Sequence, residues 1–385
     1  MAKFKFHHRV PWVRSIYARL EEARRERDES FSELGRVSAG LEQAIRERDG
    51  LVAKICSLER ELDKTRQDTD RAGTQLDRLK STLSRPERTI AAYDFLDDLP
   101  PEFDPDIYRS IHPDLQAMSV DEATDHYHAY GRNEGRRANR LRDRNEFVGM
   151  IPATAEALEI GPFNTPLLSG PNIRYLDILT REGLVERAQR IGVDSASVPE
   201  VIHYVAGGTD LSIVDRRFDI VVSSHCLEHQ PDLIQHLQGV AGLLNPGGAY
   251  FVLVPDKRFC FDHFIPLSNV AEVVAAHHEK RQKHTLRSVI EHRTLITHND
   301  SPRHWQGDHG LTFDRFAPRL EAALREYSDA RDAYIDVHAW YFTPDSAAVV
   351  LSVLADAGLC SLKMLRLYPT QYGASEFWMV LQKPY

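Results

Sequence analysis

Four short apolar runs between residues 157 and 254 constrain the fold of this chain more than any other feature. They cover Ala157–Ile160, Ile173–Leu176, Phe218–Ser223 and Ala249–Val254, and helix-like stretches separate them. Apolar strands that alternate with helices are typical of a parallel sheet covered on both faces. Residues 361–385 add two strand-like runs joined by a loop at Thr370–Ser375. We therefore predict an α/β domain over residues 145–385, with a mostly parallel sheet that ends in an antiparallel hairpin.

A heptad repeat occupies residues 17–86, which contain no proline before Pro86, a residue that ends helices. Apolar side chains recur there at spacings of three and four, the pattern of a left-handed coiled-coil seam. The seam positions include Leu34, Val37, Leu41, Ala44, Leu51, Ile55, Leu58, Leu62, Ala72, Leu76, Leu79 and Leu83, with Arg48 as an interruption. Because a seam needs a partner helix, we predict a homo-oligomer formed through a coiled coil.

The first 16 residues mix basic and aromatic side chains, among them Lys3, Phe4, Lys5, Phe6 and Trp12. Such a segment can contact an anionic membrane surface, and a solvated terminus is the alternative. Scattered cysteines and the lack of a long apolar run predict a cytoplasmic protein, peripheral at the inner membrane under the first interpretation. The net charge of −9 argues against a general nucleic-acid binder.

Residues 91–140 contain FDPDIYRSIHPDL and HYHAYGRNEGR, with Tyr108, Leu115, Tyr127 and Tyr130 at spacings that suit two short packed helices. These phrases resemble a small helical module of bacterial glycan-assembly proteins, often found beside glycosyltransferases.

Three motifs at the ends of the predicted strands indicate a ligand site. In ALEIGPFNTPLL, Glu159 ends a strand and Gly161 begins a turn where backbone can approach a ligand. Asp177 ends the next strand, and its two oxygens can bind both hydroxyls of a ribose. Capping a helix is the alternative role for Asp177. The third motif is FDIVVSSHCLEHQPDL with NPGGAYFVLVPD after it.

In this order the three motifs resemble those of class I S-adenosylmethionine-dependent methyltransferases, in the branch whose first motif reads E-I-G-P. The resemblance implies a Rossmann-like fold and S-adenosylmethionine as the cofactor. Of the glycines usual in the first motif only Gly161 is present. The implied cofactor-binding residues are Glu159, Ile160, Gly161, Pro162, Phe163, Asp177, Ile178, Asp210, Leu211, Ser224 and His225. Asp210 and Leu211 are the candidates for contact with the adenine.

The stretch 262–310 forms a histidine-rich insertion that we expect over the carboxyl ends of the strands, where ligands bind in such folds. An alcohol acceptor has to lose a proton during methyl transfer, which a histidine or carboxylate can take. The candidate catalytic residues are His263 and His309, with Asp262, Asp256 and His229 in support. For each histidine the alternative is a packed, neutral ring. A metal bound by His225, Glu228, His229 and later histidines would acidify a hydroxyl, but their spacing matches no established ligand pattern, so no metal is predicted.

The phrases VPDKRFCFDHFIPLS, RHWQGDHG and DVHAWYFTPDSAAVVL resemble those of methyltransferases encoded with bacterial surface-polysaccharide genes. This implies O-methylation of a sugar hydroxyl on a glycan or glycolipid precursor, with glycosyltransferases or a polysaccharide-assembly complex as partners. One alternative is a small-molecule or lipid O- or N-methyltransferase. Another is a coiled-coil scaffold whose methyltransferase domain is degenerate.

Overall fold

The computed structural model describes residues 15, 16, 18–25, 54, 93–206, 210–311, 313–331 and 333–385. The chain divides into one unit over Met1–Glu87 and another over Arg88–Tyr385. In the first unit residues 15, 16 and 18–25 are helical. The predicted membrane-contact segment over residues 1–16 and the coiled coil over residues 17–86 lie otherwise outside the described residues. No helix among the described residues is both long and apolar enough to cross a membrane.

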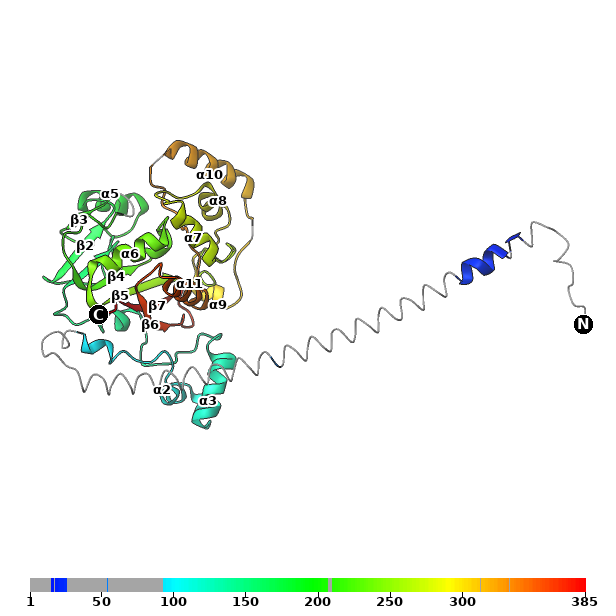
Figure 1. Ribbon diagram of the computed structural model, residues 1–385, viewed down its shortest axis with the longest axis horizontal. Helices are drawn as coiled ribbons and strands as arrows, with labels where there is room; N and C mark the ends of the chain where they lie inside the picture. Colours follow the sequence, from blue (N-terminus) through cyan, green and yellow to red (C-terminus); the bar gives the residue numbers. More distant parts are fainter. Residues whose placement is uncertain are drawn as a thin grey trace, which may run out of the picture. The chain divides into compact units, whose positions relative to one another are not determined.

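The second unit is built on a seven-stranded sheet in the order β3-β2-β1-β4-β5-β7-β6 (Figure 1). The strands are β1 (Ala157–Ile160), β2 (Ile173–Asp177), β3 (Tyr204–Val205), β4 (Phe218–Ser224), β5 (Leu244–Pro255), β6 (Lys363–Tyr368) and β7 (Glu376–Gln382). The pairs among β1 to β5 are parallel, whereas β7 runs antiparallel to both β5 and β6. The predicted mostly parallel sheet with a C-terminal antiparallel hairpin is therefore confirmed. Between β1 and β4 the strand order reverses, and ligands bind beside such switch points.

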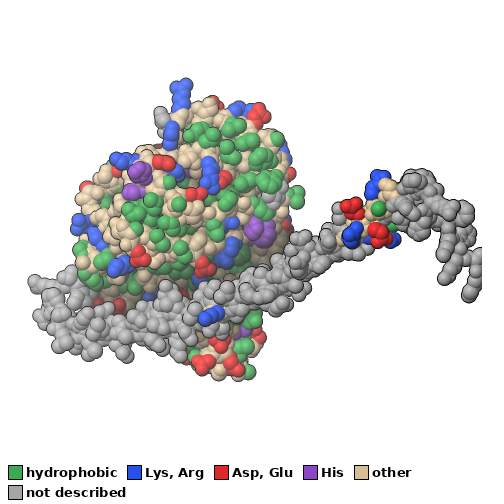
Figure 2. Space-filling model, turned by 45° about the vertical axis from the view of Figure 1, so that its right-hand side comes forward, with side chains coloured by type: hydrophobic (Ala, Val, Ile, Leu, Met, Phe, Trp, Pro, Cys, Tyr) green, Lys and Arg blue, Asp and Glu red, His purple; other side chains and the backbone are tan. Residues whose placement is uncertain are grey.

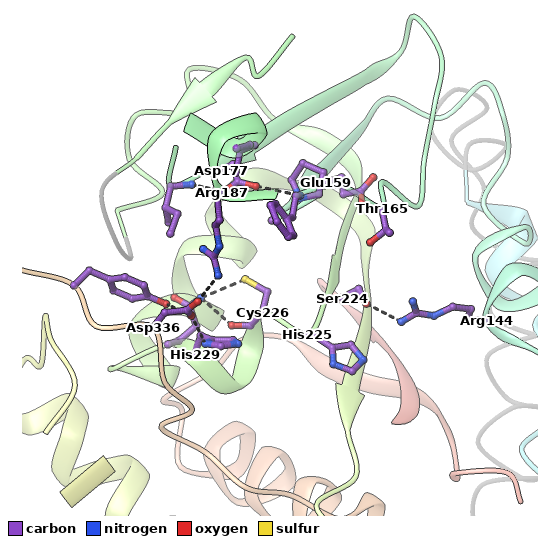
Figure 3. A pocket seen from close by; sticks show the side chains of 17 residues that line it. Arg144, Glu159, Thr165, Asp177, Arg187, Ser224, His225, Cys226, His229 and Asp336 are labelled. Carbon is purple, nitrogen blue, oxygen red and sulfur yellow. Dashed lines mark hydrogen bonds and ion pairs between the residues drawn. The ribbon is translucent and has the colours of Figure 1, made fainter. Parts of the chain in front are cut away.

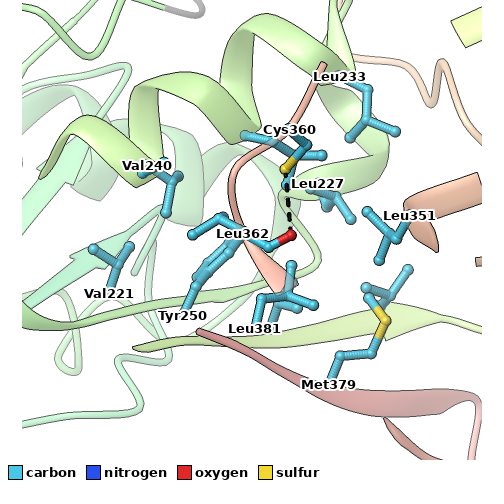
Figure 4. Close-up of a cluster of buried hydrophobic side chains, with 14 of the residues drawn as sticks. Val221, Leu227, Leu233, Val240, Tyr250, Leu351, Cys360, Leu362, Met379 and Leu381 are labelled. Carbon is cyan, nitrogen blue, oxygen red and sulfur yellow. Dashed lines mark hydrogen bonds between the residues drawn. The ribbon is translucent and has the colours of Figure 1, made fainter. Parts of the chain in front are cut away.

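Three helices cover one face of the sheet: α6 (Leu233–Leu243), α7 (Val270–His278) and α11 (Pro344–Asp356). Their apolar side chains, such as Leu233 and Leu351, join Tyr250 and Met379 of the sheet in one buried cluster (Figure 4). Tyr250 is fully buried and its hydroxyl lies 2.5 Å from that of Ser223, so the polar group inside this core has a partner.

The opposite face of the sheet is covered by the segment that precedes it. This segment includes η1 (Asp94–Leu96) and α4 (Arg144–Val148). Phe147 stacks on Trp378 of β7 with ring centroids 5.4 Å apart. The hydroxyl of Tyr93 donates to Asp219 of β4 at 2.7 Å. Residues 93–99 and 141–148 thus bury one face of the sheet, and the whole segment belongs to the same unit.

The predicted helical module contains two short helices, α2 (Pro105–Ile111) and α3 (Val120–His126). A shorter helix follows each of them: η2 (Pro113–Leu115) after α2 and the π-helical η3 (Tyr127–Gly131) after α3. Tyr108, Leu115 and Tyr127 form their buried core, as their spacing predicts. The prediction is wrong for Tyr130, whose side chain is exposed.

The long connection from β5 to α11 carries the histidine-rich stretch. Besides α7 it contains α8 (Leu286–Thr294), α9 (Ser301–Trp305) and α10 (Phe316–Ala330). A small separate core of Val289, Ala323, Ile335 and Val337 holds α8 against α10. On the side of the unit drawn in Figure 2, basic and acidic side chains alternate among the described residues, so positive charge there is dispersed.

Candidate functional site

A cavity of about 400 Å³ lies at the carboxyl ends of β1, β2 and β4 (Figure 3). Its wall combines residues that follow these strands with residues from α4, α5 (Arg181–Ile191) and the segment before α11. The lining residues are Arg144, Glu159, Gly161, Pro162, Phe163, Thr165, Asp177, Ile178, Leu184, Arg187, Ser224, His225, Cys226, His229, Gln230, Tyr334 and Asp336. The cavity therefore lies at the switch point of the sheet, as expected for this architecture.

Gly161 forms the turn after β1 with a φ of +74°, a left-handed conformation that favours glycine. Its N–H donates to the carbonyl of Leu176 at 2.8 Å, which ties the turn to β2. A Cβ at this position would lie 3.8 Å from Cβ and 3.9 Å from Sγ of Cys226. A side chain here would thus fill the space between the turn and Cys226.

Glu159 is almost fully buried and holds the loop that follows this turn. Its two carboxylate oxygens accept hydrogen bonds from the backbone N–H groups of Leu167 at 2.8 Å and Leu168 at 2.9 Å. Burial raises the pKa of Glu159 to about 7, although these two hydrogen bonds oppose the shift. The acidic residue that ends β1 therefore positions the loop and also lines the cavity.

Asp177 ends β2 with its carboxylate at the cavity wall. One oxygen accepts from the N–H of Ile178 at 2.7 Å and the other from the N–H of Phe163 at 3.2 Å. Burial raises the pKa of this carboxyl. Helix capping does not explain Asp177, because Thr180 is the N-cap of α5 and accepts from Gly183. Each Asp177 oxygen keeps a lone pair for a ligand.

Two arginines that the motifs did not indicate also line the cavity. Arg144 donates to Ser224 Oγ at 2.9 Å and binds both carboxylate oxygens of Glu376. Arg187 forms an ion pair with Asp336 and lies over the ring of Phe163. Figure 3 shows Arg144 on a different side of the cavity from Asp177 and Arg187. These residues lie on elements far apart in sequence, so no local motif could have identified them.

Two further cavities adjoin the first. One, of about 340 Å³, is lined by Arg187, His225, His229, Pro255, Cys260, Phe261, His292, Asn299, Asp336, His338 and Ser375. The other, of about 440 Å³, is lined by Arg142, Asp143, Arg144, His225, Ser301, Gln371, Tyr372, Ala374, Ser375, Glu376 and Trp378. We call these the histidine-lined cavity and the Tyr372 cavity. Among the described residues, His225 is the one that lines all three cavities.

His225 follows β4 with a φ of +50°, a strained conformation for a residue with a side chain. Its Nε2 lies 2.7 Å from Glu376 Oε2, and its Nδ1 lies 3.9 Å from Glu228 Oε1. Burial alone would lower the pKa of His225, but Glu376 and Glu228 together raise it above its ordinary value. His225 is thus an imidazole oriented by a carboxylate at the junction of the three cavities.

The structure separates the predicted catalytic residues. His229 lines both the first and the histidine-lined cavity. Asp262 is buried behind the latter and accepts from His338. His263 and His309 stack on each other with centroids 3.7 Å apart, and neither lines any of the three cavities.

Asp256 does not line any of the three cavities either. Its buried carboxylate is held by Arg258 and Thr370. Among the predicted cofactor contacts, Ile160, Asp210 and Leu211 do not line the first cavity, whereas the other eight do. Asp210 lies at the surface and accepts from the N–H of Ser212, and Leu211 is buried in the core. Their roles stay predictions.

A family model described as a methyltransferase domain matches residues 131–315. The match begins inside the predicted helical module and includes β1 to β5 with the cavity motifs. No curated protein sequence matches the chain.

Several solved methyltransferases are similar in structure. The glycopeptide N-methyltransferase MtfA is 21% identical over 30% of this chain and 55% of its own, with a TM-score of 0.23. N-methyltransferase NodS from Bradyrhizobium japonicum WM9 is 13% identical over 63% and 95%, with a TM-score of 0.30. The CcbJ methyltransferase from Streptomyces caelestis is 12% identical over 62% and 93%, with a TM-score of 0.32.

This chain spans about half the length of the MtfA chain that it matches. Similarity at such TM-scores is too weak to indicate a substrate. The family model and the cavity motifs both lie within residues 131–315. S-adenosylmethionine is the cofactor of that family. Residues 131–315 are therefore similar to a methyltransferase domain.

Proposed function

We propose that the protein transfers a methyl group from S-adenosylmethionine to a sugar hydroxyl of a bacterial surface glycan or its precursor. The observation that carries this proposal is the position of His225, an imidazole oriented by a carboxylate. It lies at the junction of the first cavity, which we call the cofactor cavity, and the two cavities that adjoin it. A hydroxyl acceptor needs a group that takes its proton, whereas an amine or carboxylate acceptor needs less help.

The residues of the first cavity fit the cofactor. The two Asp177 oxygens would accept hydrogen bonds from the ribose hydroxyls, and the Gly161 turn leaves space beside Cys226. Arg144 would bind the carboxylate of the methionyl part. Adenosylmethionine supplies a methyl group on a sulfonium sulfur that leaves as a neutral thioether.

Proton transfer would fall to His225. Glu376 accepts from Nε2, which leaves Nδ1 as the nitrogen that takes the hydroxyl proton while the acceptor oxygen receives the methyl group. Glu376 is a positioning residue, held in turn by Arg144. The acceptor would occupy the histidine-lined cavity or extend into the Tyr372 cavity, where polar groups and the exposed ring of Tyr372 suit a sugar.

The helical module supports the choice of a glycan acceptor through its resemblance to a module of glycan-assembly proteins. We propose that the coil makes a homo-oligomer and brings the domain to glycosyltransferases or to a polysaccharide-assembly complex at the inner membrane. Two domains on one coil would raise the effective concentration of enzyme on a repeating polymer.

The test is a methyl-transfer assay with isotope-labelled adenosylmethionine, the full chain, and three acceptor classes: nucleotide sugars with oligosaccharides, phenols, and amines. We expect labelled methyl ethers on the sugars alone, with the position located by NMR. Faster transfer to a phenol or amine would favour the small-molecule alternative. Cofactor binding without transfer to any acceptor would favour the scaffold.

The role of His225 has its own test. His225→Asn should lower kcat by roughly 10²- to 10⁴-fold, the usual contribution of a general base, with the Kd for adenosylmethionine little changed. The matched control is His278→Asn, an exposed histidine of α7, which should keep the wild-type kcat. Equal kcat in both variants would exclude His225 as the proton acceptor.

A further inference from the structure

Glu228, in η4 (Leu227–His229), has a carboxylate that accepts no hydrogen bond, with His225 Nδ1 and His338 Nε2 each 3.9 Å from Oε1. Its side chain is fully buried, and neither carboxylate oxygen has a hydrogen-bond partner. Nothing in the mechanism above uses Glu228 as an acid or a base. A buried carboxylate that accepts no hydrogen bond is unfavourable, so a cation in direct contact with its oxygens would stabilise it.

Two imidazoles complete a set of ligand atoms around this carboxylate. One ligand atom from each of Glu228, His229 and His338 lies within 4.8 Å of the others. Glu228 Oε1 is 3.9 Å from His338 Nε2, which is too long for a hydrogen bond. Two ligands on one ion, each about 2.0–2.2 Å from it, lie at most about 4.4 Å apart. The spacing fits atoms that share an ion.

A carboxylate lies beside each of the two imidazoles, and the one beside His338 forms a hydrogen bond. Asp262 Oδ2 lies 2.6 Å from Nδ1 of His338. Asp336 Oδ1 lies 3.2 Å from Nδ1 of His229. Metal-binding histidines usually donate their other N–H to a carboxylate, as His338 does to Asp262, which leaves Nε2 of His338 for the metal. The contact of His229 with Asp336 is an ion pair without a hydrogen bond.

The second histidine cluster, His263, His304 and His309, lacks these features, although its ligand atoms are also close together. Both nitrogens of His304 have partners, His309 Nδ1 and the carbonyl of His298. Nδ1 of His263 lies 2.8 Å from the carbonyl of Arg258. The cluster contains no carboxylate to balance a cation, so its bonds explain it as packing.

We propose that Glu228, His229 and His338 bind a divalent transition-metal ion at the wall of the histidine-lined cavity. Two imidazole nitrogens and one carboxylate suit ions such as Zn²⁺ or Mn²⁺. His229 and His338 both line that cavity, and His229 also lines the cofactor cavity. The ion can therefore bind the acceptor oxygen and make its hydroxyl more acidic. This catalytic role rests on the proposed function, whereas the binding site does not.

The test measures metal binding directly. The full chain is stripped with a chelator, dialysed, titrated with Zn²⁺ and with Mn²⁺, and analysed by elemental mass spectrometry. We expect one tightly bound ion per chain in the wild type. Glu228→Gln should abolish this binding, and Asp262→Asn should weaken it by roughly 10- to 100-fold, as is typical for the partner of a ligating histidine. His309→Asn is the matched control and should keep the ion.

Adenosylmethionine binding, measured on the same samples, shows that each variant is folded. Loss of the ion in His309→Asn but not in Glu228→Gln would overturn the proposal, as would a wild-type chain that retains no ion. The midpoint temperature of thermal unfolding gives a second readout. Zn²⁺ should raise this midpoint for the wild type but not for Glu228→Gln. If Glu228→Gln instead raises the midpoint without metal and Zn²⁺ affects neither protein, Glu228 is only an unpaired charge.

The two proposals fail in different ways. A chain that binds the ion and adenosylmethionine but methylates no sugar would contradict the glycan acceptor and leave the metal site standing. A chain that methylates sugars equally well after chelation, with no ion bound, would contradict the metal site and leave the proposed function standing.

Discussion

The buried carboxyl of Glu159 should make the stability of the protein depend on pH. Its pKa is about 7 in the folded protein against an ordinary value of 4.5, mainly because it is buried. The difference, 7 − 4.5 = 2.5 units, corresponds to about 3 kcal/mol at roughly 1.4 kcal/mol per unit. Between pH 4.5 and 7 the folded state holds more protons at this site than the unfolded state does. The free energy of unfolding should therefore fall by about 3 kcal/mol as the pH rises through this window, and level off above it.

Denaturant unfolding of the wild type and of Glu159→Gln at pH 5 and pH 8 measures this contribution. Fluorescence of Trp340 and Trp378, both buried, reports the transition of the sheet unit. The loss of stability between the two pH values should be about 2.5 kcal/mol smaller in the variant, because at pH 5 the unfolded carboxyl has already lost most of its proton. Asp262, whose pKa is raised to about 6, contributes to both proteins and cancels in the comparison. Glu186→Gln, on the exposed side of α5, should keep the wild-type loss. Equal losses in the wild type and Glu159→Gln would refute the reasoning.

Three further substitutions test the fold and the cavity. Phe147→Ala removes a fully buried ring and should cost about 3–5 kcal/mol of unfolding free energy by denaturant titration, and wild-type stability would contradict this packing. Tyr93→Phe deletes the hydrogen bond to Asp219 and should lower the free energy of unfolding by about 1.5–3 kcal/mol in the same assay. No loss of stability would show that residues 93–148 unfold separately from the sheet. Gly161→Val should weaken adenosylmethionine binding in calorimetry. The control Gly192→Ala, at a glycine with a similar φ of +76° but open space around it, should not. Equal affinities of the two variants would show that the Gly161 turn does not face the cofactor.

The sheet could be predicted from sequence because its strands are buried and apolar. The run Ala157–Ile160 is fully buried and was predicted with the bounds that the structure gives. In contrast β3 has two residues, of which Val205 is exposed, so its sequence has no distinct apolar run. The predicted coiled coil and its oligomer lie outside the described residues and stay predictions.

The site could be predicted only where it is local in sequence. Gly161 and Asp177 follow parallel strands, and such ends meet at one edge of a sheet. The role of Glu376 could not be predicted from sequence. Its contact with His225 depends on the register of β7 against β5, which pairs Glu376 with Pro255. The same holds for His338, which lies 76 residues from its partner Asp262. Spacing in sequence therefore could not separate the histidines that face a cavity from those that stack on each other.

Calorimetric titration of adenosylmethionine into the full chain tests the central claim most directly. We expect micromolar binding to the wild type. Asp177→Ala removes charged hydrogen bonds that are typically worth about 1.5–3 kcal/mol, so its Kd should rise by roughly 10- to 150-fold. Asp356→Ala, an exposed aspartate at the end of α11, should bind like the wild type. A folded wild-type chain that gives no binding heat at millimolar adenosylmethionine, or an Asp177→Ala variant that binds as tightly as the wild type, would contradict the account.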